Sequence, residues 1–288
     1  MSAKPIVAAT DGSEESLRAV DWAAREAVLR GAPLRIVSAA ATLPRMMDHH
    51  DGSGLEDVTD VLLDHRDRAR ATAAARAAKV STDLLVDSDN LSGAPALAVT
   101  ESGSGALMLV VGSRGVGAFT ALILGSVSRY AATHAPCPVV VVRDEITAAH
   151  RQVAVGIGDA DTSAAALSFA FEEATLRKAS LLAVHAWSTQ PSESARAWEH
   201  FMTPGAQAVQ EQVTRKLAAL LDDWRAKYPD VAVSQDVVYG PPGRALAGVS
   251  ARADLVVIGR RAGRQGPAAV THAVLHHAHG PVVTVPSA

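Results

Sequence analysis

The chain has 288 residues and a formal net charge of -3, so it lacks the strong positive charge by which proteins bind nucleic acids through bulk electrostatics. Hydrophobic residues make up 48% of the chain but aromatic residues only 4%, which predicts a core built mostly from Val, Leu, Ile and Ala. Cys137 is the single cysteine, which excludes an intramolecular disulfide and disfavours a cysteine-based zinc site.

We expect neither a targeting segment nor a membrane span. Lys4-Pro5 leads straight into a strand pattern rather than into the apolar stretch of a signal peptide. No apolar run approaches the roughly 20 residues that a membrane-spanning helix needs. Together with the single cysteine, these features predict a reducing, cytoplasmic location.

In the first half, aliphatic runs alternate with helical patterns. The runs predict strands near residues 5–10, 34–39, 83–87, 106–111 and 138–142. The stretches between them predict helices near residues 14–30, 55–79, 93–103 and 125–135. Ser13 is placed to cap the first helix at its N-terminus. The face that this helix buries is predicted by apolar residues at helical spacing, namely Leu17, Val20, Ala24, Ala27 and Val28.

The second half repeats the first. Val256-Val257-Ile258-Gly259 lies 147 residues after the similar run Leu109-Val110-Val111-Gly112. Further on, Pro281 lies only 143 residues after its counterpart Pro138, so the second copy lacks four residues in the region between these landmarks. The long second helix of this copy is predicted by an apolar stripe, namely Val209, Val213, Leu217, Leu220 and Trp224.

A repeat this long indicates duplicated domains, which we place at residues 1–146 and 147–288. Continuous aliphatic strands are typical of parallel strands covered on both faces. The predicted fold class is therefore α/β, with two tandem doubly wound, five-stranded parallel-sheet (Rossmann-like) domains. Ligands of such sheets bind beyond the carboxyl ends of the strands, where Asp11 and Gly112 would flank the crevice.

The connection after the fourth strand of the first half carries the clearest chemical signature. Gly112-Ser113-Arg114-Gly115 ends a buried strand, nine residues follow, and Gly125-Ser126-Val127-Ser128 opens a helix. A strand, a glycine turn and a helix N-terminus in this order gather free backbone N–H groups, and the helix dipole favours negative charge. The connection is therefore a candidate phosphate site.

The residue types of this site suit a nucleotide. Gly112 and Gly115 let the backbone turn and approach a ligand without a Cβ in the way. Hydroxyl groups are supplied by Ser113, Ser126 and Ser128. Arg114 adds a positive charge, and Asp11 offers oxygen atoms to a ribose, an adenine or the water shell of a metal. The plainer alternative is that the glycines only end a strand and cap a helix.

The spacing glycine, two residues, glycine, nine residues, glycine, then serine or threonine resembles the ATP-binding signature of the universal stress protein family. It is matched here by Gly112, Gly115, Gly125 and Ser126. The family's five-stranded α/β fold fits both halves, so the resemblance covers nearly the whole chain. It implies ATP as the ligand, with Mg²⁺ bound through the phosphates.

The resemblance also implies where each part of the nucleotide lies. Ala9 and Asp11 would face the nucleoside, and Ser38 and Ala39 would approach the adenine through backbone groups. Ribose and phosphates would be held by Gly112, Ser113, Arg114, Gly115, Gly125, Ser126, Val127 and Ser128.

In the second half the same connection is altered. Gly259-Arg260-Arg261-Ala262 has lost the second glycine. One alignment places Ala268-Ala269 at the positions of Gly125-Ser126, whereas keeping the nine-residue spacing places His272-Ala273 there. The counterpart of Asp11 is Gly158, although Asp159 and Asp161 lie close by. We therefore predict no equivalent nucleotide site in this half.

Two histidine groups, His49-His50 and His276-His277-His279, contain candidate metal ligands. Neighbouring histidines on a helix point about 100° apart, and neither a cysteine nor a well-spaced carboxylate completes a set. We expect these histidines to be surface residues, and we expect no protein-held metal.

Three functions remain open. The favoured one is an ATP-binding regulatory protein of stress responses that acts on a protein partner not yet identified. The alternatives are a slow ATP hydrolase or phosphotransferase, with Asp11 as its one carboxylate tied to the motif, and an interaction scaffold that binds no nucleotide. Because the family's last strands pair across dimers, the resemblance also implies a homodimer or pairing of strands near 138–142 and 281–285 within one chain.

Overall fold

The computed structural model describes residues 3–39, 55–115, 124–143, 149–158, 160–187, 204–261 and 269–287. The chain divides into two compact units, Met1–Arg143 and Asp144–Ala288. The predicted boundary after residue 146 falls in a stretch outside the described residues. None of the helices in the described ranges is long and apolar enough to span a membrane.

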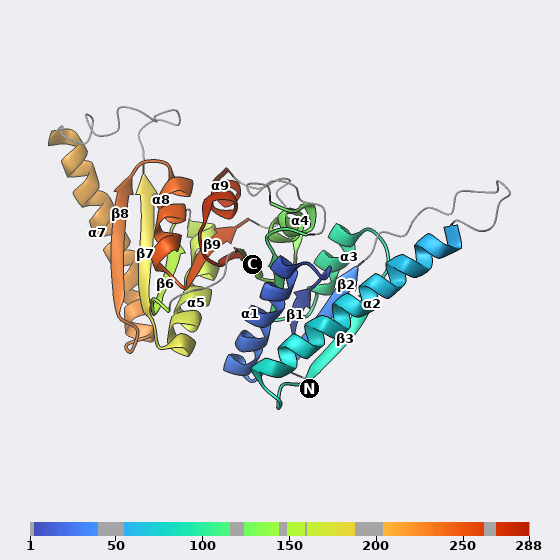
Figure 1. Ribbon diagram of the computed structural model, residues 1–288. Helices are drawn as coiled ribbons and strands as arrows, with labels where there is room; N and C mark the ends of the chain where they lie inside the picture. The colour runs from blue at the N-terminus through green and yellow to red at the C-terminus, as the bar shows by residue number, and fades with distance from the viewer. Residues whose placement is uncertain are drawn as a thin grey trace. The chain divides into compact units, whose positions relative to one another are not determined.

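The first unit alternates strands and helices along the chain (Figure 1). Its elements are β1 (Ile6–Ala9), α1 (Glu14–Arg30), β2 (Leu34–Ala39), α2 (Leu55–Val80), β3 (Val86–Leu91), α3 (Pro95–Ser102), β4 (Met108–Gly112), α4 (Ser126–His134) and β5 (Val139–Val142). These strands are parallel and lie in the order β3-β2-β1-β4-β5. Helices α1 and α2 pack together over one face of the sheet, and α3 and α4 pack together over the other.

The second unit has the same arrangement. Its elements are β6 (Gln152–Gly156), α5 (Ala160–Arg177), β7 (Ser180–Trp187), α7 (Pro204–Lys227), β8 (Val233–Tyr239), α8 (Pro242–Val249), the short 3₁₀ helix η1 (Ser250–Arg252), β9 (Leu255–Arg260), α9 (Ala269–His277) and β10 (Val282–Pro286). Its strands are parallel in the order β10-β9-β6-β7-β8.

This topology confirms the predicted α/β fold class with two tandem doubly wound sheets. In the first unit the chain moves from β1 to β2 and β3 on one side, then crosses back to β4 and β5 on the other. The direction of winding therefore reverses between β1 and β4, and the loops that follow these two strands diverge. Such a switch point leaves a crevice beyond the carboxyl ends of the strands.

Helix α1 shows how local sequence sets an element's bounds. Ser13 has extended backbone geometry, and its Oγ accepts a hydrogen bond from the Ser16 N–H at 3.3 Å, which confirms the predicted N-cap. At the other end, Gly31 adopts φ 60°, and its N–H group bonds back to the carbonyl groups of Ala27 and Val28. A left-handed residue of this kind ends the helix, and glycine adopts it without strain.

The predicted strand near 83–87 is shifted in the structure, because β3 begins only at Val86 and continues to Leu91. The aliphatic pair Leu84-Leu85 suggested a buried strand, but Leu85 is 75% exposed. β3 is an edge strand that pairs with β2 alone in the first unit, and its sequence is mostly polar. An edge strand needs no continuous apolar run, so the prediction from apolar runs placed this strand too early in the chain.

The predicted apolar stripe of α1 is correct except at its margin, whereas that of α7 is correct only in part, since Val209 is 39% exposed. On α1, Leu17, Val20 and Ala24 are buried as expected, but Val28 is 47% exposed. On α7, Leu217 is buried, whereas Leu220 is 42% exposed and the next residue, Leu221, is fully buried instead. Helical spacing defines a face about 100° wide, and only the packed partner decides which residue at its edge is covered.

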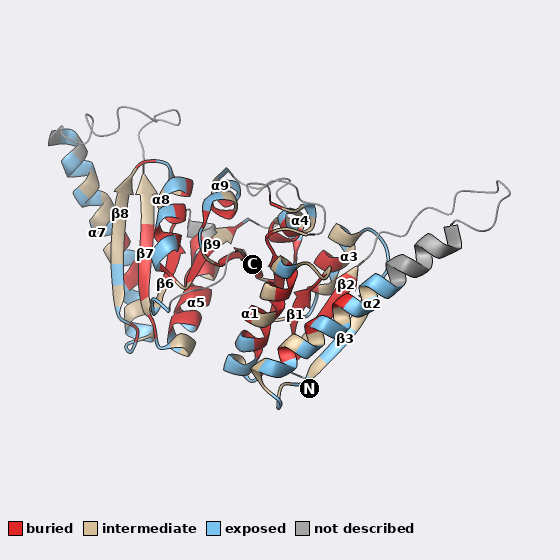
Figure 2. Ribbon diagram, in the orientation of Figure 1, coloured by how far each residue is buried: buried red, intermediate tan, exposed pale blue. Residues whose placement is uncertain are grey.

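Figure 2 shows that burial is concentrated in the central strands and in the helix faces that cover them. The core is aliphatic, as the composition predicts, and in β1 the side chains of Ile6, Val7 and Ala8 are fully buried. Cys137, just before β5, is also buried and forms no disulfide. The core thus holds the strand ends at fixed positions, and the crevice lies just beyond them.

Candidate functional site

A cavity of about 360 Å³ lies at the switch point of the first unit, beyond the ends of β1 and β4. This volume is in the range of small-molecule pockets. Ten of the twelve predicted site residues line it, namely Ala9, Asp11, Ala39, Gly112, Arg114, Gly115, Gly125, Ser126, Val127 and Ser128. The other two, Ser38 and Ser113, are buried at 2% and 3% exposure and do not line the cavity.

The sequence did not single out six further lining residues, namely Thr10, Ser16, Pro95, Val99, Val111 and Leu124. Pro95 and Val99 belong to α3, which packs beside α4. Because α3 is separate in the sequence from the glycine turn, the sequence alone did not show that it contributes to the cavity. Ser16 carried a detectable signal, since it lies three residues after the helix cap and shares a helix face with it.

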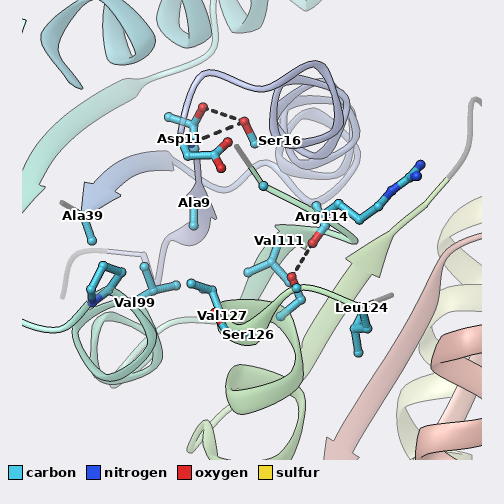
Figure 3. Close-up of a pocket in the computed structure, with 16 residues that line it drawn as sticks. Ala9, Asp11, Ser16, Ala39, Val99, Val111, Arg114, Leu124, Ser126 and Val127 are labelled. Carbon is cyan, nitrogen blue, oxygen red and sulfur yellow. Dashed lines mark hydrogen bonds between the residues drawn. The ribbon is translucent and has the colours of Figure 1, made fainter. Parts of the chain in front are cut away.

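The carboxyl end of β1 is held by a hydrogen-bonded network (Figure 3). Thr10 Oγ1 and Ser16 Oγ share a buried hydrogen bond of 3.0 Å, and the Asp11 N–H donates to Ser16 Oγ at 3.3 Å. Asp11 Oδ1 accepts from the Ser13 N–H at 3.0 Å and from Ser13 Oγ at 2.6 Å. The carboxylate of Asp11 is therefore fixed by its own turn, with one oxygen fully used.

The second oxygen of Asp11 meets the glycine turn. A Cβ added to Gly115 would overlap with Asp11 Oδ2. The absence of a side chain at this position therefore leaves room for the carboxylate at the rim of the cavity. This contact joins the two chain segments, after β1 and after β4, that the sequence analysis assigned to the same site.

Gly112 is required for a different close approach. A Cβ there would stand 2.8 Å from the carbonyl oxygen of Glu15 and 3.0 Å from the nitrogen of Ser16. Such distances are shorter than a Cβ tolerates against backbone atoms, which cannot easily move. Gly112 thus lets the first turn of α1 pack directly on the end of β4.

Helix α4 points its N-terminus at the cavity. Its N-cap is Gly125, which has no side chain to accept from the first-turn N–H groups, and its own N–H donates to the carbonyl of Ser113 at 2.9 Å. Ser128 Oγ donates to the carbonyl of Gly112 at 2.5 Å and so ties the helix to β4. The N–H groups of Ser126 to Ser128 precede the first hydrogen-bonded turn and have no partner within the helix. They form an electropositive end suited to an anion.

The opposite side of the cavity is apolar. In Figure 3, Asp11 lies on one side, Val99 and Val127 lie on the other, and Ala9 and Ala39 lie between them. Small and branched apolar side chains here make a slot suited to a flat ring. The cavity therefore combines an apolar slot, a fixed carboxylate and a helix N-terminus.

The second unit keeps part of the backbone arrangement of this site but carries different residues in it. Gly158 N–H donates to Ser163 Oγ at 3.1 Å, as Asp11 does to its own serine, but glycine brings no carboxylate to this position. Leu246 is 4% exposed, and its Cδ1 lies 2.8 Å from the point where a Cβ on Gly156 would stand. Gly156 occupies the place of Ala9 and Leu246 that of Val99 at the 147-residue offset. Leu246 thus packs on Gly156 at the end of β6, where Ala9 and Val99 line the cavity of the first unit.

Helix α9 begins at Ala269, which favours the alignment of Ala268-Ala269 with Gly125-Ser126 over the one that keeps the nine-residue spacing. The second-unit connection, of which residues 262–268 lie outside the described ranges, is therefore the shorter one. On α9, the rings of His272 and His276 lie 4.2 Å apart. Within the part of the chain that the structure describes, no group of three or more His, Cys, Asp or Glu side chains could hold a metal ion. His49 and His50 lie outside that part.

Comparison with known proteins agrees with this architecture. The profile described as the universal stress protein family matches residues 2–143 and again residues 150–286. Universal stress protein Rv2005c of Mycobacterium tuberculosis is 36% identical over 296 residues, which cover 96% of this chain and 95% of that protein. Universal stress protein Rv2623 of the same organism is 34% identical over 281 residues, or 91% of this chain and 87% of that protein.

Among solved structures, a universal stress protein from Archaeoglobus fulgidus superposes with a TM-score of 0.69 at 15% sequence identity and covers 100% of both chains. At this identity the likeness bears on the fold alone. The two profile matches, by contrast, correspond to the two units of the structure and include every element of the candidate site. The chain therefore belongs to the universal stress protein family and carries two of its domains in tandem.

Proposed function

We propose that the first unit binds an adenine nucleotide, with ATP as the physiological ligand, and that the second unit does not. The observation that carries this proposal is the contact between Asp11 and Gly115 at the rim of a cavity that also receives the N-terminus of α4. A carboxylate suits the ribose hydroxyl groups of a nucleotide, and a helix N-terminus suits its phosphates.

Each part of the pocket suits one part of ATP. The apolar slot formed by Ala9, Ala39 and Val99 accommodates the adenine ring. The fixed carboxylate of Asp11 accepts hydrogen bonds from ribose hydroxyl groups, as a carboxylate does in many dinucleotide sites. The free N–H groups at the start of α4 receive the phosphates.

Mg²⁺ would accompany ATP through the phosphates rather than through the protein. Of the described residues that line the cavity, Asp11 is the one with a carboxylate, and its Oδ1 is already engaged by Ser13. Mg²⁺ commonly keeps several water ligands and binds through substrate phosphates with few protein groups. The donor set here fits that mode of binding.

We further propose that nucleotide occupancy regulates the binding of a protein partner in a stress response. A ligand shifts such an equilibrium only by its differential affinity for the two states. The pairing of the last strands, within one chain or between two copies, stays a prediction of the family resemblance.

The direct test is to denature the purified protein and identify any released nucleotide, then titrate the emptied protein with ATP and with adenosine by calorimetry. We expect ATP to bind at one site per chain and to raise the melting temperature in the presence of Mg²⁺. Protein that carries no nucleotide and shows no thermal shift would support the scaffold alternative. Rapid, Asp11-dependent turnover in a single-turnover assay would instead support the hydrolase.

A further inference from the structure

An ion pair at the edge of the cavity links the glycine turn to helix α1. The Arg114 guanidinium lies 3.4 Å from the Glu15 carboxylate, and the same carboxylate lies 3.7 Å from Arg18. The side chains of Arg114 and Glu15 are 24% and 25% exposed, so neither is deeply buried. Arg114 lines the cavity, whereas Glu15 stands just outside it.

Arg114 is able to reach the phosphate end of the pocket. Its Cα lies 3.6 Å from the point where a Cβ on Gly125 would stand, which places its backbone beside the N-terminus of α4. In Figure 3 its side chain extends away from Ala9, outward from the nucleoside side of the pocket. Rotation about the side-chain bonds alone would bring the guanidinium over the start of α4, where it could bind a phosphate through two N–H groups.

Glu15, in contrast, is held in place. It belongs to the first turn of α1, two residues after the N-cap Ser13, and its backbone packs against Gly112 at the end of β4. A negative side chain in this turn is also favoured by the helix dipole. The backbone of Glu15 is therefore fixed, which keeps its carboxylate on α1, and the longer side chain of Arg114 is the one that can turn toward α4.

We propose that Glu15 competes with the nucleotide's phosphates for Arg114 and thereby sets how strongly the pocket distinguishes ATP from adenosine. Without nucleotide, Arg114 pairs with Glu15. When a polyphosphate occupies the start of α4, the guanidinium transfers to it, and Glu15 keeps its contact with Arg18. Binding of phosphate must therefore overcome the Glu15–Arg114 pair, whereas binding of adenosine leaves the pair intact. This inference rests on the proposed nucleotide site of the first unit.

The experiment compares Glu15→Gln with the wild-type protein, using adenosine, AMP, ADP and ATP as calorimetric ligands. Loss of the competing charge is expected to strengthen ATP binding about twofold to fivefold, the range of a partly exposed ion pair, and to leave adenosine binding within about 1.5-fold. The gain should grow from AMP to ATP and should shrink at about 1 M salt, where charges are screened within a few ångströms.

Two further variants separate competition from general electrostatics. Asp83→Asn removes one negative charge from the exposed turn before β3, at the amino-terminal edge of the sheet, and should leave ATP affinity unchanged. Arg114→Gln should weaken ATP binding, and adding Glu15→Gln to it should restore little, because the contested group is gone. Circular dichroism and melting temperature establish that each variant is folded.

The possible results are distinct. If the wild-type protein binds none of the four ligands, the proposed nucleotide site fails. If it binds ATP but Glu15→Gln leaves the ratio of ATP to adenosine affinity unchanged, the competition is refuted while the site stands. An equal gain from Glu15→Gln with and without Arg114 would also refute it, because the effect would then be plain repulsion between Glu15 and the phosphates.

Discussion

The contact between Asp11 and Gly115 makes Gly115→Ala a sharp test of the site. The structure gives Gly115 no positive φ, so alanine meets no backbone strain there. The added Cβ would, however, collide with Asp11 Oδ2. Either the carboxylate turns, which disturbs the two hydrogen bonds that Ser13 donates to Oδ1, or the turn after β4 shifts and carries residue 115 away from Asp11.

The size of the effect follows from those bonds. A hydrogen bond to a charged group contributes about 1.5–3 kcal/mol, so a turned Asp11 forfeits an interaction of this order or loses its proposed contact with the ribose. We therefore expect Gly115→Ala to weaken ATP binding about tenfold to a hundredfold, which corresponds to about 1.4–2.8 kcal/mol. Calorimetric titration of the nucleotide-free protein measures this change.

A matched control and a second background make the result decisive. Gly248→Ala adds the same methyl group on the exposed side of α8, where nothing lies within 4 Å, and should not change ATP affinity. In the Asp11→Ala background, Gly115→Ala should cost little more, because the colliding carboxylate is absent. Equal ATP affinities for Gly115→Ala and Gly248→Ala, or the same loss in both backgrounds, would refute the reasoning.

Three further predictions concern the stability of the fold and the number of nucleotide sites. Ser128→Ala removes the buried hydrogen bond to the Gly112 carbonyl and should lower the free energy of unfolding by about 1–3 kcal/mol in urea denaturation; an unchanged midpoint would contradict the tie between α4 and β4. Because Gly158, Ala262 and Ala268 stand in the second unit at the positions of Asp11, Gly115 and Gly125, calorimetry should give one nucleotide per chain, and two equivalent sites would overturn that assignment. The hydrogen bond from Arg35 lowers the pKa of Asp89, so this pair stabilises the fold above the ordinary aspartate pKa of about 3.9 and ceases to do so as pH falls through the lower, folded value. The stability difference between wild type and Asp89→Asn should therefore shrink on acidification and should be modest throughout, since Asp89 is 49% exposed; a difference that grows toward low pH would reverse the sign of the argument.

Much of the fold was readable from the sequence because it is encoded locally. The aliphatic run that became β4 and the alternation of strands with helices predict a parallel sheet without any knowledge of distant contacts. The bounds of α1 were predicted at 14–30 and observed at Glu14–Arg30, since Ser13 and Gly31 act within a turn of the helix ends. The misplaced β3 shows the limit of this reasoning, because an edge strand has little apolar signal to read.

The candidate site, like the fold, has features that the sequence predicted and contacts that only the structure showed. The glycine spacing identified the turn and the N-terminus of α4, and chain order alone placed Asp11 at the same edge of the sheet. The sequence could not reveal that α3 brings Val99 to the pocket or that Glu15 faces Arg114, because these contacts join segments far apart in the chain.

The sequence by itself therefore determined the duplicated parallel-sheet architecture and the loss of the glycine turn from the second copy, since both are written in short runs of adjacent residues. Only the tertiary structure decided that Asp11 and Gly115 lie against each other and that Leu246 packs on Gly156. Periodicity along a chain reports which face of an element is buried, whereas the packing of one element on another decides which side chains meet.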